Sequence, residues 1–316
     1  MSRFIVRRAF QTLIVLFLVS VFTFLIFQII PNGNPAERLA GRDATPAQVA
    51  AIANAWGFNK PIYVQYGLMM QKIFTGQVVS YVQGINVLDE IRRGLPATAS
   101  LAIGASVIWL TWGIVLGLVS TLKPGGWTDR LLGFAALVAI STPAFVIGAI
   151  LLVIFAYKTS IFPSEGYVSL TQNPWQWFMH LVLPWCALSL PFIGLYSRVL
   201  RANVLDVMHD DYIEMAKAKG LSRRRVLIHH VLRVSMISIV SLWGLDFAGL
   251  IGGGAILVES IFSLQGIGQY AAMSIQELDV PPIMVIVMYT AFFVVVVGAL
   301  VDIGYAFLDP RIELNA

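Results

Sequence analysis

Cysteine and charge are both scarce in this sequence, and each scarcity narrows the class of protein. The single cysteine, Cys186, cannot form an internal disulfide and lies in an apolar run, where we expect a small buried side chain. Only 12% of the 316 residues are charged, whereas a typical soluble domain has about 25%. Apolar residues make up 58% of the chain, and the mean hydropathy is +0.80. This composition predicts a protein that crosses a membrane several times.

A nucleotide-binding loop is missing as well. The pattern G-x-x-x-x-G-K-[ST] does not occur, so we predict that the chain does not hydrolyse ATP and is not an enzyme. The run Gly252-Gly253-Gly254 lacks the Lys and Ser/Thr of such a loop, and its apolar context indicates close helix packing or a hinge. The four histidines show no metal-site spacing, and the apolar runs offer no nucleophile–base pair for a membrane-embedded hydrolase. We therefore expect no catalytic residue, metal or cofactor.

Long apolar runs are what the sequence has in abundance. A helix needs about 20 mainly apolar residues to cross the hydrocarbon core of a bilayer. Six runs reach that length, and the third is interrupted at Pro143. We predict an all-α polytopic membrane protein with one transmembrane domain over residues 1–316. Its six transmembrane helices are expected at about 9–30, 98–122, 131–157, 179–200, 234–258 and 282–303.

The basic residues indicate the orientation of these helices. With a cytoplasmic N-terminus, 14 of the 21 Lys and Arg are cytoplasmic, and six of the other seven fall in one long outer loop, residues 31–97. Cytoplasmic loops carry such a basic excess, and long loops obey the rule only weakly. We therefore expect both termini in the cytoplasm. The net charge of +4 then reflects topology and contact with the lipid bilayer, and we expect no nucleic-acid partner.

The outer loop 31–97 contains two amphipathic helix patterns. Thr45-Pro46-Ala47-Gln48 is a capping box with proline at the first helical position, and Gly57 ends that helix. A second pattern with helical spacing follows Pro61. Both are too polar to span a membrane, so we expect them to cover the outer mouth or lie on the bilayer surface.

The longest polar interval in the second half of the chain is the cytoplasmic loop 201–233. Asp211-x-x-Glu214 predicts a helix start at which the Asp211 carboxylate accepts from free N–H groups of the first turn. Gly220 suits a left-handed helix end, which leaves about nine helical residues. A helix this short is unstable alone in water, so it must dock on something. The residues expected to share one face are Tyr212, Met215, Ala216 and Lys219.

This loop also carries a family resemblance. Glu214-Met215-Ala216-x-x-x-Gly220 resembles the E-A-A-x-x-x-G loop of ABC-importer permeases, with Met215 in place of the second Ala. Its flanks resemble the dipeptide/oligopeptide/nickel branch of that family. These flanks are Asp211-Tyr212, Ala216-Lys217-Ala218-Lys219-Gly220-Leu221 and His230-Val231-Leu232-Arg233. Further matches cover nearly the whole chain and include Phe4-Ile5-x-Arg7-Arg8, Ile30-Pro31-x-Gly33-x-Pro35, Leu95-Pro96-Ala97-Thr98, Val258-Glu259-x-Ile261-Phe262 and Asp302-x-x-Tyr305-x-x-x-Asp309-Pro310-Arg311. Asn34 and Gln265 depart from the family's usual Asp and Pro.

The resemblance implies a type I ABC-importer permease of the B-type, in the inner membrane of a bacterial or archaeal cell. Such a permease forms half of a pore with a homologous second permease subunit. Two ATP-binding cassette subunits lie beneath the pair, and an extracytoplasmic substrate-binding protein docks above. The E-A-A loop is the cytoplasmic coupling helix, which sits in a groove of the ATPase. The coupling residues implied here are Asp211, Tyr212, Glu214, Ala216, Lys219 and Gly220.

The cargo is a separate expectation from the family. The resemblance favours di- or oligopeptides. Nickel, glutathione and oligosaccharides are carried by close relatives and stay open as alternatives. A rival from another class is a stand-alone, proton-coupled secondary transporter, for which an inverted internal repeat would be expected, and we see none.

Two acidic residues lie in or beside the fifth predicted span. Asp246 is the thirteenth of the 25 residues from 234 to 258, near the bilayer centre, so its carboxylate should face the protein interior or a wet cavity. Two interpretations of Asp246 are open. In the first, it lines the translocation path and holds a cargo amine or a water chain. In the second, it is a structural Asp that is protonated or hydrogen-bonded. Glu259 lies just outside the span and either guards the outer gate or faces solvent.

Overall fold

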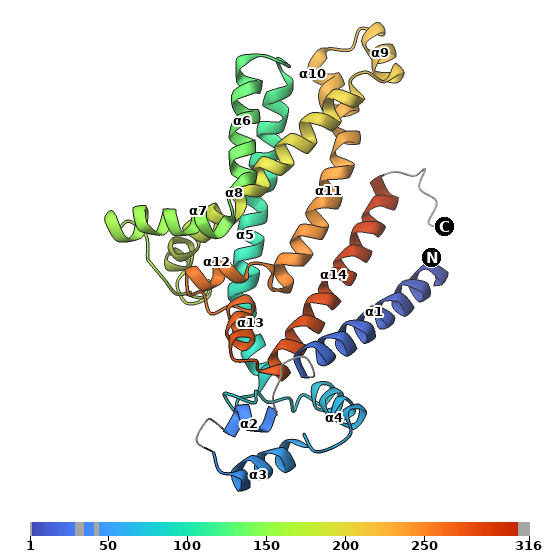
Figure 1. Cartoon of the computed structure of the whole chain (residues 1–316). Coiled ribbons are helices and arrows are strands. Elements are labelled where there is room, and N and C mark those ends of the chain that lie inside the picture. The colour runs from blue at the N-terminus through green and yellow to red at the C-terminus, as the bar shows by residue number, and fades with distance from the viewer. Residues whose placement is uncertain (1, 29–34, 41–43, 309–316) are drawn as a thin grey trace.

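The computed structural model describes residues 2–28, 35–40 and 44–308, and within these ranges the chain is all-α (Figure 1). No strand occurs in these ranges, and the β-type contact that does occur is an isolated bridge between Val79 and Asn86. Parts of two expected motifs, around Pro31 and at the closing Asp309-Pro310-Arg311, lie outside the described residues.

Long apolar helices form the body of the molecule. Five segments are long and apolar enough to cross a membrane, and a sixth is a bent pair of helices. The five belong to α1 (Ser2–Gln28), α5 (Val87–Thr121), α8 (Pro174–Val207), the run Arg224–Gly254 that includes α11 (Leu232–Gly249), and α14 (Val280–Leu308). The bent pair is α6 (Trp127–Ser141) with α7 (Ala144–Leu151) and the π-helical η1 (Leu152–Lys158). The fold is therefore that of a polytopic all-α membrane protein.

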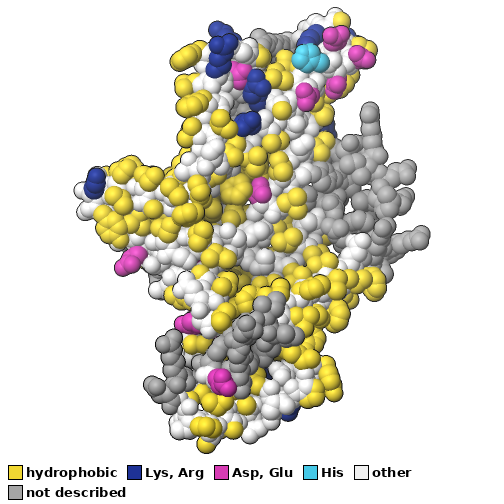
Figure 2. Space-filling model, in the orientation of Figure 1, with side chains coloured by type: hydrophobic (Ala, Val, Ile, Leu, Met, Phe, Trp, Pro, Cys, Tyr) yellow, Lys and Arg dark blue, Asp and Glu magenta, His cyan; other side chains and the backbone are white. Residues whose placement is uncertain are grey.

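Shorter helices lie at the two ends of this body. One end carries a cap made of α2 (Pro35–Ala40), α3 (Pro46–Trp56) and α4 (Ile62–Phe74) (Figure 1). The other end carries α9 (Asp211–Ala218) and α10 (Arg223–Val226). On the face that Figure 2 shows, hydrophobic side chains cover the long helices, and charged side chains gather at the α9–α10 end. This distribution suits a body that contacts lipid between two wet ends.

The second span begins earlier than expected. Residues 87–97, predicted to belong to the outer loop 31–97, are the first turns of α5. Asn86 starts the helix, because its side chain accepts from the N–H groups of Leu88 and Asp89. Pro96 lies inside the helix and does not end it. The predicted outer loop is therefore shorter by this segment.

The third apolar run contains a sharp bend. Thr142 is extended, with φ −99° and ψ 119°, and α7 restarts after Pro143 at an angle of 96° to α6. A residue before proline is driven out of the α-helical region, which explains why the break falls here. The interruption expected at Pro143 is thus a change of direction.

The fifth span is not the single helix expected over 234–258. Its helical turns widen at the π-helical segment η3 (Leu250–Gly254), and Gly253 has φ +101°. The chain then forms α12 (Ile256–Ile261), and α13 (Ile267–Gln276) follows. Only glycine adopts such a φ without strain, so the glycine run makes a break in the span.

The predicted cytoplasmic loop 201–233 is also shorter in the structure. At one side, α8 continues to Val207. At the other, the helix resumes at Arg223 and runs through the π-helical η2 (Leu227–Val231) into α11. The segment between the two long helices is therefore little more than α9 and its turns.

Helices α5 and α8 make the most extensive helix contact of the described chain. A Cβ atom on Gly113 would lie 2.7 Å from the Tyr196 Cβ, and one on Gly117 would lie 3.0 Å from the Ser197 carbonyl oxygen. Glycine at these two positions lets the helices approach closely. Because lipid tails are as apolar as the side chains, this packing holds the pair together in a membrane.

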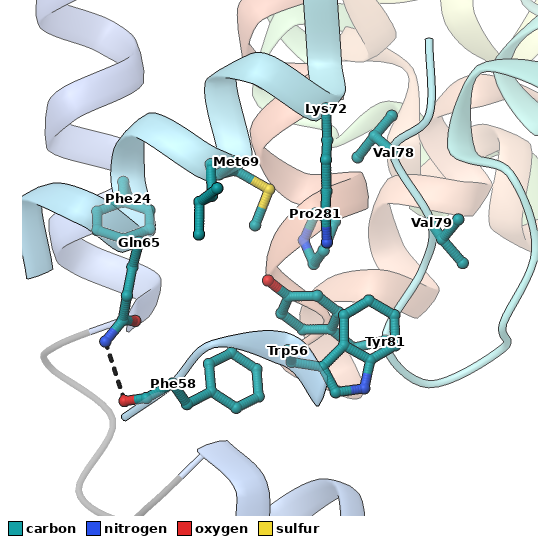
Figure 3. A pocket seen from close by; sticks show the side chains of 11 residues that line it. Phe24, Trp56, Phe58, Gln65, Met69, Lys72, Val78, Val79, Tyr81 and Pro281 are labelled. Carbon is teal, nitrogen blue, oxygen red and sulfur yellow. Dashed lines mark hydrogen bonds between the residues drawn. The ribbon is translucent and has the colours of Figure 1, made fainter. Parts of the chain in front are cut away.

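The cap formed by α2–α4 packs on the helical body, because Met69 of α4 shares an apolar cluster with Phe24 of α1 and Met284 of α14. The predicted capping box at Thr45 and Gln48 is confirmed, and Gly57 ends α3 with φ +75°. Figure 3 shows Trp56 and Tyr81 side by side, with ring centres 4.7 Å apart, and Lys72 Nζ lies 5.1 Å from the Trp56 ring centre. Asp279, before α14, accepts from Ser80 Oγ at 2.5 Å and fixes the cap to the helical body.

Candidate functional site: the α9 surface and its supporting helices

The helix predicted from Asp211-x-x-Glu214 is α9, and its start differs from the prediction. It has eight residues, Asp211–Ala218. Asp210 occupies the N-cap position and makes no capping side-chain hydrogen bond, so the expected capping role of Asp211 was wrong. Asp211 and Glu214 instead lie inside the first turn, where a carboxylate still opposes the positive end of the helix dipole. At the other end Gly220 has φ +77°, which confirms the left-handed turn.

The two sides of α9 have different surroundings. Ile213 is fully buried and Ala216 is 7% exposed, and both belong to the main apolar core. Tyr212 is 39% and Met215 59% exposed. The predicted face of Tyr212, Met215, Ala216 and Lys219 is therefore divided, because Ala216 turns inward with Ile213 at i, i+3. The outward set contains Asp211, Tyr212, Glu214, Met215, Lys219 and Gly220, which are all exposed.

The chemistry of this outward surface is mixed. It places two carboxylates, an ammonium group and a phenol beside an apolar thioether. Partial burial, and then the nearby Asp210 carboxylate, raise the pKa of the Tyr212 phenol, which therefore stays a neutral hydrogen-bond donor. Such a surface can bind a protein partner through both polar and apolar contacts.

An apolar cavity of about 340 Å³ lies behind α9. It separates part of α9 from the end of α5 and from η2. Its lining residues are Thr121, Leu122, Met208, Lys217, Leu221, Val226, Leu227 and Val231. The helix is therefore anchored at Ile213 and Ala216 but is not packed solidly along its whole inner side.

A partly buried ion pair beside this site was not predicted; the Asp129 side chain is 7% exposed and the Arg201 side chain 34%. The Arg201 Nε and Nη2 groups donate to the two Asp129 carboxylate oxygens at 2.6 and 2.7 Å. The Gly125 N–H donates to the same carboxylate at 2.8 Å. The pair ties the first turn of α6 to α8, and the Gly125 hydrogen bond adds the loop that precedes α6. In the sequence the two residues are only one acid and one base among several, so nothing marks them as partners.

Asp246 lies in α11, and its side chain is half-buried. The Tyr196 hydroxyl, on α8, donates to Asp246 Oδ2 at 2.7 Å. Of the two interpretations made from the sequence, the hydrogen-bonded structural Asp has an observed partner. The pairing was not predictable, because the two residues are 50 positions apart.

Glu259 does not face solvent, so that alternative was wrong. Its side chain is 0% exposed and accepts from Thr98 Oγ1 at 2.8 Å and from the Gln269 N–H at 3.0 Å. Burial raises the pKa of Glu259, while these hydrogen bonds oppose the rise. The carboxyl group joins α5, α12 and the first turn of α13. Among the described residues, no group of three His, Cys, Asp or Glu is placed to hold a metal ion.

Comparison with known proteins identifies the family. Residues 113–314 match the model of the binding-protein-dependent transport system inner membrane component. The chain belongs to this family. Residues 1–102 match the model of the N-terminal part of such membrane components. The resemblance seen in the E-A-A-like loop is therefore confirmed over most of the chain.

Individual relatives agree with this assignment. A probable peptide ABC transporter permease of Sinorhizobium fredii is 35% identical over 314 residues, which cover 99% of this chain and all of the relative. A dipeptide transport system permease of Alkalihalophilus pseudofirmus is 33% identical over 334 residues, covering 99% of this chain and all of that protein. A probable D,D-dipeptide transport system permease of Escherichia coli is 32% identical over 328 residues, covering 97% and 96%.

Membership defines the general role of the chain. It is a multi-pass membrane permease of an ABC importer, so it is a transport subunit and not an enzyme. ATP hydrolysis lies in partner subunits, and a substrate-binding protein delivers the cargo. The proton-coupled secondary transporter considered above is not supported.

Proposed function

We propose that this permease forms half of the translocation pore of an importer for di- or oligopeptides. Support comes from the relatives described above, whose names refer to peptides, dipeptides or D,D-dipeptides and which match along nearly their whole length. These names favour peptides over nickel, glutathione or oligosaccharides. The other half of the pore is a homologous second permease, and both chain termini lie in the cytoplasm of a bacterial or archaeal cell.

The observation that carries the coupling part of the proposal is the two-sided environment of α9. A short helix whose inner side is buried at Ile213 and whose outer side is exposed is suited to receive force from a partner. We assign the outer side to one of two ATP-binding cassette subunits. The proposed contact residues are Asp211, Tyr212, Glu214, Lys219 and Gly220, with Ala216 as an anchor.

Asp246 and Glu259 remain proposed residues of the translocation path. Asp246 is half-buried near the middle of a membrane-spanning helix, where an ionisable group is expected to serve the interior of the protein. Glu259 is buried beside the break in that helix, so we propose that it holds the outer end of the path together.

The test is co-purification from mildly solubilised membranes, followed by transport in vesicles. We expect an ATPase and a second permease to accompany this chain, and peptide-loaded binding protein to stimulate ATP hydrolysis. A chain that purifies alone and moves cargo without ATP under a proton gradient would refute the proposal. Stimulation by a loaded nickel- or sugar-binding protein, and not by a peptide-binding one, would replace the cargo class alone.

A further inference from the structure

The helices on the two sides of α9 are α8 and α11. Helix α8 ends at Val207, shortly before α9, and the chain returns through α10 and η2 into α11 (Figure 1). A displacement of α9 can therefore be transmitted along the chain to α8 and to α11, which contact each other. The stronger the contact between α8 and α11, the less these two helices can move relative to each other within the membrane when α9 is displaced.

A polar link joins these helices within the membrane. The Tyr196 hydroxyl donates to Asp246 Oδ2 at 2.7 Å. Within the described residues, one other side-chain hydrogen bond joins α8 to α11, from Asn203 Nδ2 to the Ser235 carbonyl at a long 3.5 Å. A short hydrogen bond to a carboxyl group in a membrane is therefore the main directional contact between them.

The tyrosine side of this link is rigid. Tyr196 is 0% exposed, and its ring centre lies 6.2 Å from that of Trp109 and 6.4 Å from that of Phe192. The close approach at Gly113 fixes its backbone against α5. The phenol is thus part of the tightly packed α5–α8 unit.

The aspartate side lies on a helix that is bounded by irregular segments at both ends. Helix α11 ends in η3, where Gly253 has φ +101° and the chain turns into α12. At its other end it continues through η2 towards α9. Helix α11 therefore lies between a glycine break and the coupling segment, and such breaks are common hinge positions.

We propose that Tyr196 and Asp246 form a releasable latch that holds α11 against the α5–α8 unit in one state of the pore. Movement of α9 strains the latch, and its release lets α11 pivot near Gly253. The inference rests on the proposed coupling role of α9 and adds two positioning residues to it. It gives Asp246 a task that does not require contact with cargo.

The test uses the full importer in proteoliposomes, with uptake and ATP hydrolysis measured with and without loaded binding protein. Tyr196→Phe removes the donor, and Asp246→Leu removes the acceptor. Each should raise cargo-independent ATP hydrolysis and lower uptake per ATP by roughly tenfold, because one hydrogen bond to a carboxyl group shifts a two-state equilibrium by about that factor. The double variant should be no worse than either single one.

Two further variants make the test specific. Asp246→Asn keeps a carbonyl oxygen that accepts from Tyr196, so the latch can still form and cargo-independent ATP hydrolysis should not rise as it does in Asp246→Leu. Tyr289→Phe is the control, because the Tyr289 hydroxyl is buried without a hydrogen-bond partner among the described residues. It should change neither measurement.

Several outcomes would overturn the latch. If Tyr196→Phe behaves like Tyr289→Phe, the hydrogen bond has no role in coupling. If Asp246→Asn abolishes uptake while Tyr196→Phe keeps it, the carboxylate serves cargo directly. If Tyr196→Phe lowers the yield of assembled complex together with uptake, its role is structural. Failure of the proposed function is distinct, since the unmodified importer would then show no peptide-stimulated ATP hydrolysis.

Discussion

At the residue scale, one backbone angle at Gly220 determines how the chain turns after α9. Its φ of +77° turns the chain directly after α9, while a Cβ atom there would meet nothing within 4 Å. Space is therefore available for a side chain, and conformation is the only obstacle. Any substitution at this position changes the turn and not the packing.

We predict that Gly220→Val abolishes transport. A β-branched residue at this φ costs of order 1–3 kcal/mol, so the turn rearranges and α9 is presented differently. Peptide uptake in vesicles is the measurement, and the matched control is Gly133→Val, a helical glycine whose Cβ would also meet nothing within 4 Å. Normal uptake and normal complex assembly in Gly220→Val would refute the coupling-helix assignment.

Glu259 gives a second residue-scale prediction, in the pH dependence of stability. Its folded-state pKa is raised, mainly by burial, so the folded protein binds the proton more tightly than the unfolded chain. Its contribution to stability is therefore full below the ordinary glutamate pKa and is lost as the pH rises through the raised value. Thermal unfolding in detergent across pH should show this fall.

The substitution Glu259→Gln should flatten that slope, because the side chain no longer titrates. Glu277→Gln, at an exposed position after α13, is the control and should leave the slope unchanged. An identical slope in Glu259→Gln and in the unmodified permease would assign the pH dependence to another group.

At the scale of elements, α9 has a buried side that anchors it and an exposed side that we propose contacts the ATPase. Ile213 is fully buried in the permease core, whereas its neighbour Tyr212, about 100° around the helix, is exposed. Adjacent residues on one helix thus serve two different surfaces. A substitution of Tyr212 should therefore weaken ATPase binding, whereas a substitution of Ile213 should lower the stability of the permease.

We predict that Tyr212→Ala leaves the Tm of the purified permease nearly unchanged but weakens ATPase binding by roughly tenfold, a typical loss for an interface aromatic. Ile213→Ala should instead destabilise the permease by about 2–4 kcal/mol, because it leaves a cavity in the core. Thermal unfolding and a binding titration with the ATPase distinguish them. Equal effects of the two substitutions on ATPase binding and on Tm would contradict the two-sided description.

The ion pair between Arg201 and Asp129 belongs to the same scale, because it ties α8 to the first turn of α6. Asp129→Ala should destabilise this end by about 2 kcal/mol, the usual worth of hydrogen bonds to charged groups. Lys123→Ala is the control, since it removes an exposed charge of the α5–α6 loop that forms no ion pair in the described structure. Proteolysis of the cytoplasmic loops measures the effect. Equal protection in both variants would show that the pair does not stabilise the loop.

Local chemistry explains which elements could be predicted from the sequence. The Thr45 capping box, the Gly57 end and the Pro143 break each depend on residues a few positions apart, and each appears in the structure. The start of α5 at Val87 was missed because the polar turns before Pro96 read as loop. The break in α11 was expected only as one of two roles for the glycine run.

The candidate site was predicted only in part from the sequence. The position of α9 followed from a compact motif. Its two-sided burial did not, because the inward turn of Ile213 depends on its packing into the main apolar core. The Tyr196–Asp246 bond and the burial of Glu259 likewise arise from tertiary packing, which leaves no local pattern in the chain.

At the scale of the whole molecule, the topology is open to a direct test in a Cys186→Ala background. A cysteine at Lys60, in the segment between α3 and α4, should react with a membrane-impermeant maleimide added to intact cells. A cysteine at Lys123, between α5 and α6, should react only after the membrane is opened. The reverse pattern would invert the orientation that the basic residues indicate.

The separation of the two sides of α9 also bears on how such importers change over generations. The residues proposed to contact the ATPase are exposed, whereas Ile213 and Ala216 belong to the core of this permease. If the proposed contact is correct, substitutions of the exposed residues of α9 can change which ATPase binds, while the buried residues keep the permease folded. After a gene duplication, one copy of the permease could therefore come to bind a different ATPase through a few surface substitutions that do not lower its stability.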